Sequence, residues 1–248
     1  MLKLPTLLEL LEAGVHFGHQ TSKRYPKTKP YIFGIRSGIH IINLEKTVEK
    51  LKEALDFIKE ISAKNGTILF LGTKKQAKDI VKKAALEVNM PYITERWLGG
   101  TFTNLDTIIK NIKKMKKMEE EKEKGEFKKY TKKEQLKFEK EIEKLKRLFD
   151  GLRELNKLPE AIFIIGINEE ETAEKEAKKK NVPIVAIIDT NTKPQNVAYP
   201  IPANDDGIKS IKMMVNLVVE AIKEGKSVTK NEQSTNSSEN LKANNEKV

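Results

Sequence analysis

Short apolar runs that alternate with amphipathic helical patterns are the feature that most limits the folds open to this chain. Residues 67–72 form an apolar run of the kind found in a strand that is buried on both faces of a parallel sheet. The alternation continues, with strands expected at 92–93, 161–166, 183–188 and 199–201 and helices at 74–88, 169–180 and 205–224. Alternating strands and helices predict an α/β fold with a doubly wound parallel sheet.

A long segment without strand signals interrupts this alternation between residues 105 and 155. Apolar residues recur there at three- and four-residue steps, first from Leu105 to Met115 and then from Phe138 to Leu152. A narrow apolar stripe of this kind is typical of a coiled-coil seam. We therefore expect an inserted antiparallel coiled-coil hairpin that turns near Gly125 and projects from the domain.

Smaller elements are expected before the first buried strand. Thr6 and Glu9 have the spacing of a helix capping box, and the helix that they start should end at Gly14. A loop at 21–30, which is rich in proline and basic residues, should precede a hairpin of strands at 31–35 and 39–42 and a helix at 44–63.

Four segments follow from these patterns. The N-terminal helix, the basic loop and the first half of the α/β domain occupy 1–104, and the coiled-coil hairpin occupies 105–155. The second half of the domain occupies 156–224. The remaining tail, 225–248, is polar and has few large apolar residues, so we expect it to be disordered.

The chain carries a large excess of positive charge. It has 47 Lys and Arg against 36 Asp and Glu among 248 residues, which gives a net charge of +11 at pH 7. About +7 of this excess lies at 110–147, where 16 basic residues accompany 9 acidic ones. Such a surplus favours a polyanionic partner, either nucleic acid or an anionic membrane.

The absence of cysteine excludes disulfides, cysteine nucleophiles and thiolate metal sites, and it fits a reducing compartment. No apolar run approaches the roughly 18 residues that a membrane span needs. Lys3, Pro5 and Glu9 interrupt the apolar start of the chain, which therefore does not read as a signal peptide. We expect a soluble cytoplasmic protein without a membrane partner.

An α/β chain can be a nucleotide-dependent enzyme, but this one lacks the phosphate-binding motifs of that class. Residues 72–75 follow a strand and open a helix, where backbone N–H groups and the helix dipole can hold a phosphate. Neither G-x-G-x-x-G nor G-x-x-x-x-G-K-[ST] occurs, however, and no serine or threonine lies in a nucleophile elbow. We expect no catalytic activity and no nucleotide cofactor. Lys74 and Lys75 suit an external phosphate instead, such as that of an RNA backbone.

Basic residues in the loop at 21–30 are the strongest candidates for phosphate contacts. They are dense, the loop is stiffened by proline, and acidic neighbours are few, which solubility alone does not explain. The predicted RNA-binding residues are Lys23, Arg24, Lys27, Lys29, Arg36, Lys74, Lys75 and Arg96. The lysine clusters of the hairpin fit either RNA contact or the solvated face of a coiled coil, and both interpretations stay open.

Trp97 is the only tryptophan of the chain. We expect it to pack at the base of the hairpin, where Gly99 and Gly100 allow the chain to turn. The alternative is that Trp97 stacks on a nucleic-acid base.

A histidine pair and later aspartates can gather at one edge of the sheet. The carboxyl ends of parallel strands share an edge, and aspartates follow two of the predicted strands. A divalent metal such as zinc or magnesium is a possible cofactor there. Its candidate ligands are His16, His19, Asp189 and Asp205, with Asp206 as a further carboxylate. The alternative is that both histidines form hydrogen bonds or face RNA within a loop.

Several distinctive strings occur in a fixed order along the chain. They are AGVHFGHQT at 13–21, KPYIFG at 29–34, HIINLEKT at 40–47, RWLGGT at 96–101 with TN at 103–104, LPEA at 158–161, DTN at 189–191, and IP and NDD within 201–206. In order and spacing these strings closely resemble the second protein of the bacterial-type small ribosomal subunit. The resemblance covers about residues 7–226.

This resemblance implies a Rossmann-like α/β domain without a cofactor, with a coiled-coil hairpin found in the bacterial and organellar branch. It implies binding to small-subunit ribosomal RNA between head and body, and late joining during assembly. The implied protein partners are neighbouring small-subunit proteins, including the large multi-OB-fold protein that captures mRNA, and no DNA partner is implied.

Two segments depart from the family pattern. The loop at 192–198 lacks the usual further acidic residues, which weakens the case for a metal site that uses it. Arg24-Tyr25-Pro26 replaces a more usual Trp-Asn-Pro, but the cations are kept.

We therefore expect a non-enzymatic constituent of the small ribosomal subunit that acts in translation and is ribosome-associated in the cytoplasm. Two other functions compete with this one. A nucleotide-dependent enzyme on a Rossmann-like fold would be stabilised by a small-molecule ligand. A coiled-coil adaptor without an RNA role would lose its binding on deletion of 105–155.

Overall fold

A five-stranded parallel sheet forms the centre of the chain. The computed structural model describes residues 3–194 and 196–245, with side chains described as far as Ser227. The strands lie in the order β5 (Tyr92–Ile93), β4 (Ile68–Leu71), β6 (Ala161–Ile164), β7 (Ile184–Ile188) and β8 (Tyr199–Pro202). All neighbouring strands are parallel, which confirms the predicted α/β class and is consistent with a Rossmann-like fold.

The sheet separates two apolar cores. Because successive strand residues point to opposite faces, Ile68 and Phe70 enter one core and Leu69 and Leu71 the other. The first core is closed by α1 (Leu7–Glu12), α2 (Leu44–Ala63), α3 (Lys78–Glu87) and the start of α7 (Ile208–Asn245). The second is closed by α6 (Glu171–Lys179) and by the base of the helical insertion. Helices therefore cover both faces of the sheet, as the doubly wound prediction requires.

The strand order places a topological switch point between β4 and β6. From β4 the chain first adds β5 on one side and then returns to add β6, β7 and β8 on the other. Ligands of open α/β sheets bind outside the carboxyl ends of the strands at such a point. Here Gly166 follows β6 with φ +76°, and a Cβ at this position would lie 2.6 Å from Cε of Lys74. The side chain of Lys74 therefore fills the switch point.

A small antiparallel sheet lies beside the carboxyl edge of the large one. It consists of β1 (Phe17–Gln20), β3 (Ile39–Ile42) and β2 (Ile32–Arg36), in that order. The predicted β2–β3 hairpin is confirmed, and so is the capping box of Thr6 and Glu9 at the start of α1. Strand β1 was not predicted, because its four residues mix Gly, His and Gln without an apolar alternation. The loop at 21–30 contains short 3-10 turns at Thr21–Lys23 and Pro26–Tyr31.

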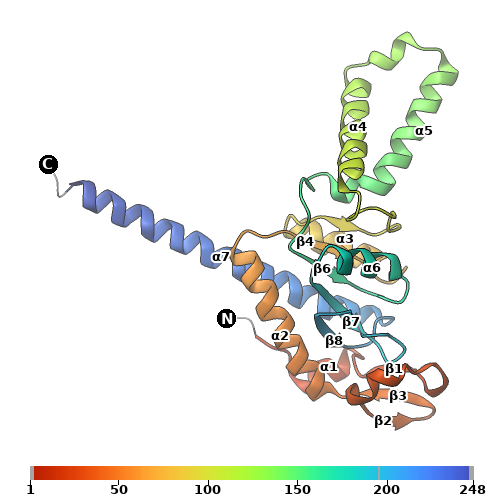
Figure 1. Cartoon of the computed structure of the whole chain (residues 1–248), viewed down its shortest axis with the longest axis vertical. Helices are drawn as coiled ribbons and strands as arrows, with labels where there is room; N and C mark the ends of the chain where they lie inside the picture. The colour runs from red at the N-terminus through yellow and green to blue at the C-terminus, as the bar shows by residue number, and fades with distance from the viewer. Residues whose placement is uncertain (1–2, 195, 246–248) are drawn as a thin grey trace.

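Two helices, α4 (Leu105–Glu123) and α5 (Lys132–Phe149), form the insertion and project from the end of the molecule opposite the small sheet (Figure 1). Gly125 has φ +74° at the turn between them, as expected. Their buried residues include Ile108, Ile112 and Ile142. The antiparallel helix pair is thus present, whereas its coiled-coil geometry stays a prediction. Helix α5 ends at Phe149, before the expected limit of 155, and a 3-10 turn at Asp150–Leu152 follows it.

Helix α7 continues through Asn245, beyond Glu224 where we expected the last helix to end (Figure 1). Its first turns are held in the core, and adding residues to a formed helix costs far less than starting one. Side chains after Ser227 and all of residues 246–248 lie outside the described residues, so the predicted disorder of 225–248 stays a prediction. Neither α7 nor any other helix of the described residues is long and apolar enough to cross a membrane.

Candidate functional site

The loop at 21–30, called the basic loop below, is anchored by uncharged residues to the loop after β7. The backbone N–H of Tyr25 and the hydroxyl of Thr28 both donate to the carbonyl oxygen of Thr190, each at 2.9 Å. The Thr28 hydroxyl also lies 2.7 Å from the carbonyl oxygen of Tyr25, and its side chain is buried. These bonds fix the path of the loop without using any of its cations.

Strand β1 approaches the same residue from the other side. The N–H of His19 donates to the Thr190 hydroxyl at 2.9 Å. A Cβ at Gly18 would lie 2.7 Å from Cγ2 of Thr190, so only glycine allows this approach. Thr190 therefore joins the small sheet and the basic loop to the large sheet. This role of Thr190 was not predicted, although the residue lies in the distinctive DTN string at 189–191.

Five predicted RNA-binding residues lie together on the surface without neutralising partners. Within the part of the chain that the structure describes, none of them forms an ion pair and all are exposed: Lys23, Arg24, Lys27, Lys29 and Arg36. The insertion is different, because several of its lysines pair with glutamates of the neighbouring helix: Lys114 with Glu141, Lys122 with Glu139 and Lys146 with Glu119. The positive charge of the insertion is thus offset in part by pairing, although others of its lysines, such as Lys113 and Lys128, form no ion pair within the described residues, whereas none of the five cations at the basic loop is paired.

Lys74 does not face outward, which corrects the prediction that it meets an external phosphate. Its side chain is 11% exposed, and its Nζ lies 2.9 Å from Oδ1 of Asp205 and 2.9 Å from Oδ1 of Asp206. Burial alone would lower the pKa of Lys74, but these carboxylates outweigh burial and raise the pKa above its usual range. Lys74 is used to neutralise acidic groups at the carboxyl edge of the sheet. Lys75 and Arg96 are exposed, as the prediction requires.

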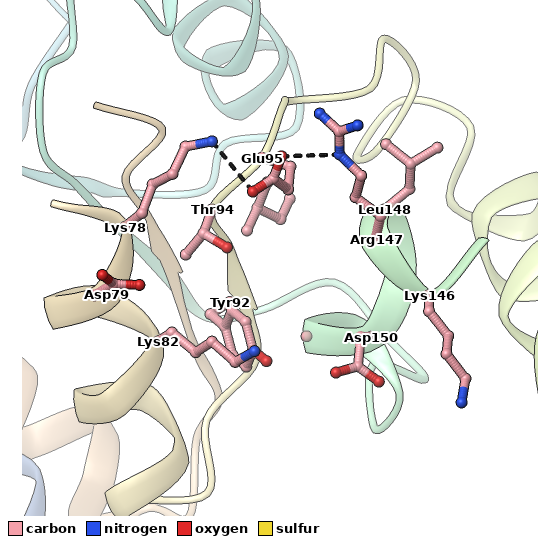
Figure 2. Close-up of a pocket in the computed structure, with 12 residues that line it drawn as sticks. Lys78, Asp79, Lys82, Tyr92, Thr94, Glu95, Lys146, Arg147, Leu148 and Asp150 are labelled. Atoms are coloured by element: carbon pink, nitrogen blue, oxygen red, sulfur yellow. Dashed lines mark hydrogen bonds and ion pairs between the residues drawn. The ribbon is translucent and has the colours of Figure 1, made fainter. Parts of the chain in front are cut away.

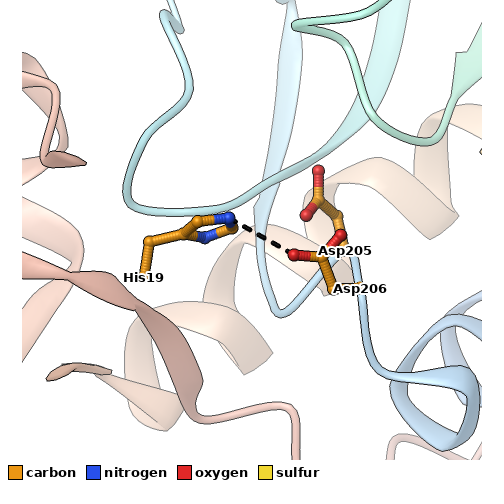
Figure 3. A group of neighbouring side chains, drawn as sticks. All are labelled: His19, Asp205 and Asp206. Atoms are coloured by element: carbon orange, nitrogen blue, oxygen red, sulfur yellow. Dashed lines mark ion pairs between the residues drawn. The ribbon is translucent and has the colours of Figure 1, made fainter.

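His19, Asp205 and Asp206 form a compact cluster at this edge (Figure 3). Each offers one ligand atom, and these atoms lie within 4.8 Å of one another. His19 Nε2 is 3.3 Å from Oδ2 of Asp206, while its Nδ1 is 3.1 Å from Oδ2 of Asp189. Asp189 therefore orients the imidazole from behind rather than joining the cluster. His19, Asp189 and Asp205 thus lie close together at the edge where they were expected, while their role as metal ligands stays a prediction.

The charge states of this cluster are set by its surroundings. The hydrogen bond with Asp189 is the main cause that raises the pKa of His19, against the opposing effect of burial. Burial raises the pKa of Asp205 to about 6, although Lys74 acts in the opposite direction. An imidazole with two carboxylates is a donor set that suits zinc better than magnesium. The ammonium of Lys74 already occupies part of the space between the carboxylates, so a metal ion would have to displace it.

His16 lies outside the cluster, which corrects its assignment as a ligand. Its ring packs against Phe17 in a tilted arrangement with 4.0 Å between centroids, and burial lowers its pKa. His16 lies in the turn before β1, whereas His19 lies within the strand, so the H-x-x-H spacing does not bring both imidazoles to the cluster. The spacing would place both on one face only in a helix.

A buried carboxylate that the sequence analysis missed holds the loop at the base of the insertion. Glu176 on α6 is 8% exposed and accepts hydrogen bonds from the N–H groups of Gly100, Phe102 and Thr103 at 2.7 to 3.1 Å. The indole N–H of Trp97 also donates to it, at 3.3 Å. Burial would raise the pKa of Glu176, but these donors lower it. Trp97 is itself buried, as we expected for packing at the hairpin base.

A polar cleft of about 480 Å³ separates α3 and β5 from the end of α5 (Figure 2). Glu95 lies between the two sides and bonds Nζ of Lys78 at 3.1 Å and Nε of Arg147 at 3.0 Å. Both cations lower its pKa. Glu95 therefore links the insertion to the α/β body, and two of the cations that line the cleft are already paired.

Comparison with known protein families gives one match. The model of the family described as ribosomal protein S2 matches residues 10–225, which is well over half of the chain. The matched range contains the basic loop, the Thr190 anchor and the His19 cluster.

Replacing Glu176 by glutamine should destabilise the protein for two reasons. The substitution removes the negative charge of the acceptor, and it places an NH₂ donor where a carboxylate oxygen accepts hydrogen bonds from backbone N–H groups. Hydrogen bonds to a charged acceptor are worth about 1.5–3 kcal/mol each, and we expect a loss of about 2–3 kcal/mol for Glu176→Gln at pH 7. Urea denaturation of the wild type and the variant measures this difference in the free energy of unfolding. Glu171→Gln, on the exposed side of the same helix, is the matched control and should change stability by less than about 0.5 kcal/mol.

The same pair of variants gives a pH test. The pKa of Glu176 is lowered in the folded state, so its contribution is fully present above its unfolded pKa of 4.5 and is lost as pH falls through the folded value. The stability gap between wild type and Glu176→Gln should therefore narrow below about pH 4. A gap that is constant from pH 7 to pH 3 would contradict the assigned role of the carboxylate.

Proposed function

Because the chain belongs to the ribosomal protein S2 family, it is a structural component of the small ribosomal subunit that acts in translation, and we propose that it binds small-subunit ribosomal RNA through the basic loop and Arg36. Proteins of this family are structural rather than enzymatic, and they act on the ribosome in the cytoplasm. The RNA contacts and the protein neighbours of this chain belong to the proposal.

The observation that carries the proposal is the set of five exposed cations that lack ion-pair partners within the described residues. Each cation that contacts a phosphate releases a counterion, and this release supplies most of the sequence-independent affinity for nucleic acid. A cation that already pairs with a glutamate gains less free energy on binding a phosphate, because the phosphate contact must replace the existing ion pair. All five cations at the basic loop are therefore available to phosphates, whereas only part of the lysines of the insertion are.

Rigid anchoring of the loop supports the same proposal. Thr190 accepts the bonds from Tyr25 and Thr28, so the cations project from a backbone whose path is already set. Ordering such a loop on binding costs less conformational entropy than ordering a free one. Exposed Lys75 and Arg96 extend the proposed contact surface along the α/β body.

Further assignments follow from the family rather than from contacts of this chain. We assign the chain to the region between head and body, with late joining in assembly and a role in docking the large multi-OB-fold mRNA-binding protein. We also assign coiled-coil packing to the α4–α5 pair, since its buried residues recur at helical spacing. The ion pairs of its lysines favour a structural or protein-contacting role for the insertion over RNA contact.

The nucleotide-dependent enzyme is the weaker alternative. Nucleotide phosphates in folds of this topology lie at the switch point, and here that place holds Lys74 with its carboxylate partners. A phosphate there would meet Asp205 and Asp206 as well as the lysine, and the like charges repel.

Neutralising the five cations should weaken RNA binding and reduce its dependence on salt. The slope of log K against log salt is about −0.7 to −0.9 per phosphate contact, so changing all five to glutamine should reduce its magnitude by about 4. Filter binding of small-subunit RNA at several salt concentrations measures the slope. The variant carries Lys23→Gln, Arg24→Gln, Lys27→Gln, Lys29→Gln and Arg36→Gln.

A control variant of equal charge distinguishes this surface from a general effect of net charge. It carries five lysine-to-glutamine changes in the insertion, at Lys113, Lys114, Lys116, Lys117 and Lys128. We expect the slope of log K against log salt for this control variant to stay close to that of the wild type. Equal losses in both variants would show that net charge, and not the basic loop, drives binding.

We also propose that the His19 cluster binds a divalent cation such as zinc, which displaces the ammonium of Lys74 and takes His19 Nε2, Asp205 and Asp206 as ligands. The support is the arrangement of an imidazole already oriented by Asp189 beside two carboxylates. Added zinc should raise the melting temperature of the wild-type chain and have a much smaller effect on His19→Ala. His16→Ala, outside the cluster, is the control. An equal zinc shift in all three proteins would refute the site.

A further inference from the structure

The side chain of Lys74 has a defined place at the carboxyl edge of the sheet. Gly166 follows β6 with φ +76°, and a Cβ at this position would lie 2.6 Å from Cε and 3.0 Å from Cδ of Lys74. The aliphatic part of the lysine therefore fills space that a side chain at position 166 would take. Only 11% of the Lys74 side chain is exposed, so its ammonium is held among the acidic residues of this edge.

Three carboxylates surround this ammonium. Nζ of Lys74 lies 2.9 Å from Oδ1 of Asp205 and 2.9 Å from Oδ1 of Asp206. A third carboxylate oxygen, Oε1 of Glu169, lies 3.6 Å away. The contact with Asp206 is a hydrogen bond, whereas Oδ1 of Asp205 is buried and accepts no hydrogen bond of good geometry within the described residues. The ammonium thus serves Asp205 mainly as a positive charge, a role that another cation can take.

The same carboxylates are proposed ligands of the metal. Asp205 and Asp206 form the cluster with His19 (Figure 3), and both already contact Nζ of Lys74. The ammonium neutralises part of their negative charge, and it also repels a divalent ion that approaches them. Metal ion and ammonium therefore compete for one pair of carboxylates.

Metal ions differ in what they gain in return for displacing the ammonium. Magnesium is a hard ion that takes oxygen ligands and gives up its water reluctantly, so the imidazole of His19 adds little to its affinity. Zinc binds imidazole nitrogen well. Nε2 of His19 faces Asp206, and the contact of Nδ1 with Asp189 fixes the ring in this orientation. Zinc therefore has a source of affinity at this edge that magnesium lacks.

We propose that Lys74 determines the metal specificity of the His19 cluster, as an internal cation that excludes magnesium and is displaced by an imidazole-binding ion such as zinc. Specificity is a difference between two affinities. Both ions must displace the same ammonium, and only zinc has a further ligand that offsets this cost. Lys74 in this role depends on the zinc site proposed above but is not one of its ligands. The exclusion has a use on a chain that binds RNA, because phosphates gather cations around them.

Removing the ammonium tests the proposal. Competition with a chromophoric chelator measures zinc affinity, and the melting temperature at constant ionic strength reports magnesium binding. The proteins are the wild type, Lys74→Leu and the control Lys83→Leu, which changes an exposed lysine of α3 outside the cluster. We expect Lys74→Leu to bind zinc at least about tenfold more tightly than the wild type and to be stabilised by millimolar magnesium. Lys83→Leu should match the wild type in zinc affinity, and magnesium should stabilise neither.

A second measurement uses the wild-type chain alone, since Lys74→Leu leaves Asp205 buried without its partner and can fail to fold. The chain reacts with an amine-acylating reagent without metal, with zinc or with magnesium, and mass spectrometry follows each lysine. We expect zinc to raise the acylation rate of Lys74 several-fold, because the displaced amine reaches solvent, and magnesium to leave this rate unchanged. The rate at Lys83 should be the same in all three conditions.

The possible failures separate the role of Lys74 from the metal site itself. Zinc binding that requires His19 but is equal in the wild type and Lys74→Leu, or that leaves acylation of Lys74 unchanged, would keep the metal site and refute the role of Lys74. Magnesium binding by the wild type would refute the exclusion, and so would zinc binding by Lys74→Leu alone. Absence of zinc binding in every protein would refute the metal site and the role of Lys74 together.

Discussion

The carbonyl and hydroxyl oxygens of Thr190 are the point on which the functional surface depends. They accept bonds from His19, Tyr25 and Thr28, which come from β1 and from the basic loop. Together with the contacts of His19 with Asp189 and Asp206, these bonds attach the small sheet and the basic loop to the carboxyl edge of the large sheet. Glycine at position 18 makes the approach possible, because any side chain there would collide with Thr190. Thr190, which follows the buried strand β7, thus helps to fix where the cations of the basic loop lie on the surface.

The protein uses its lysines and arginines in two different ways. Lys74, Lys78 and Arg147 pair with carboxylates and hold parts of the fold together, at the carboxyl edge of the sheet and at the base of the insertion. The cations of the basic loop have no such partners among the described residues and stay available to a polyanion. Net charge alone does not separate these two uses, because both contribute equally to it. The separation follows from which cations face carboxylates in the folded chain.

Hydrophobic patterning predicted the large sheet well, since runs such as 68–71 are buried on both faces and carry a strong signal. Asp189 and Asp205 were correctly predicted to lie near each other, because parallel strands end at one edge of the sheet. His19 reaches the same edge from β1, a strand that the patterning did not predict. The spacing of residues that are close in sequence was less informative about which side chains meet at the site. It grouped His16 with His19, although His16 lies in the turn before β1 and packs against Phe17 instead. It also placed Lys74 outside, because the carboxylates that draw it inward are about 130 residues away in sequence. Contacts at such separations, including those of Glu176, leave no local pattern.

The basic loop, as we propose, contacts small-subunit ribosomal RNA. A photoreactive amino acid at position 27, in chains assembled into small subunits, tests this directly. The account predicts that irradiation cross-links the chain to the ribosomal RNA, and that the same group at position 113 in the insertion gives much less RNA product. Cross-links from position 27 that go only to protein, or RNA cross-links that come mainly from position 113, would contradict it.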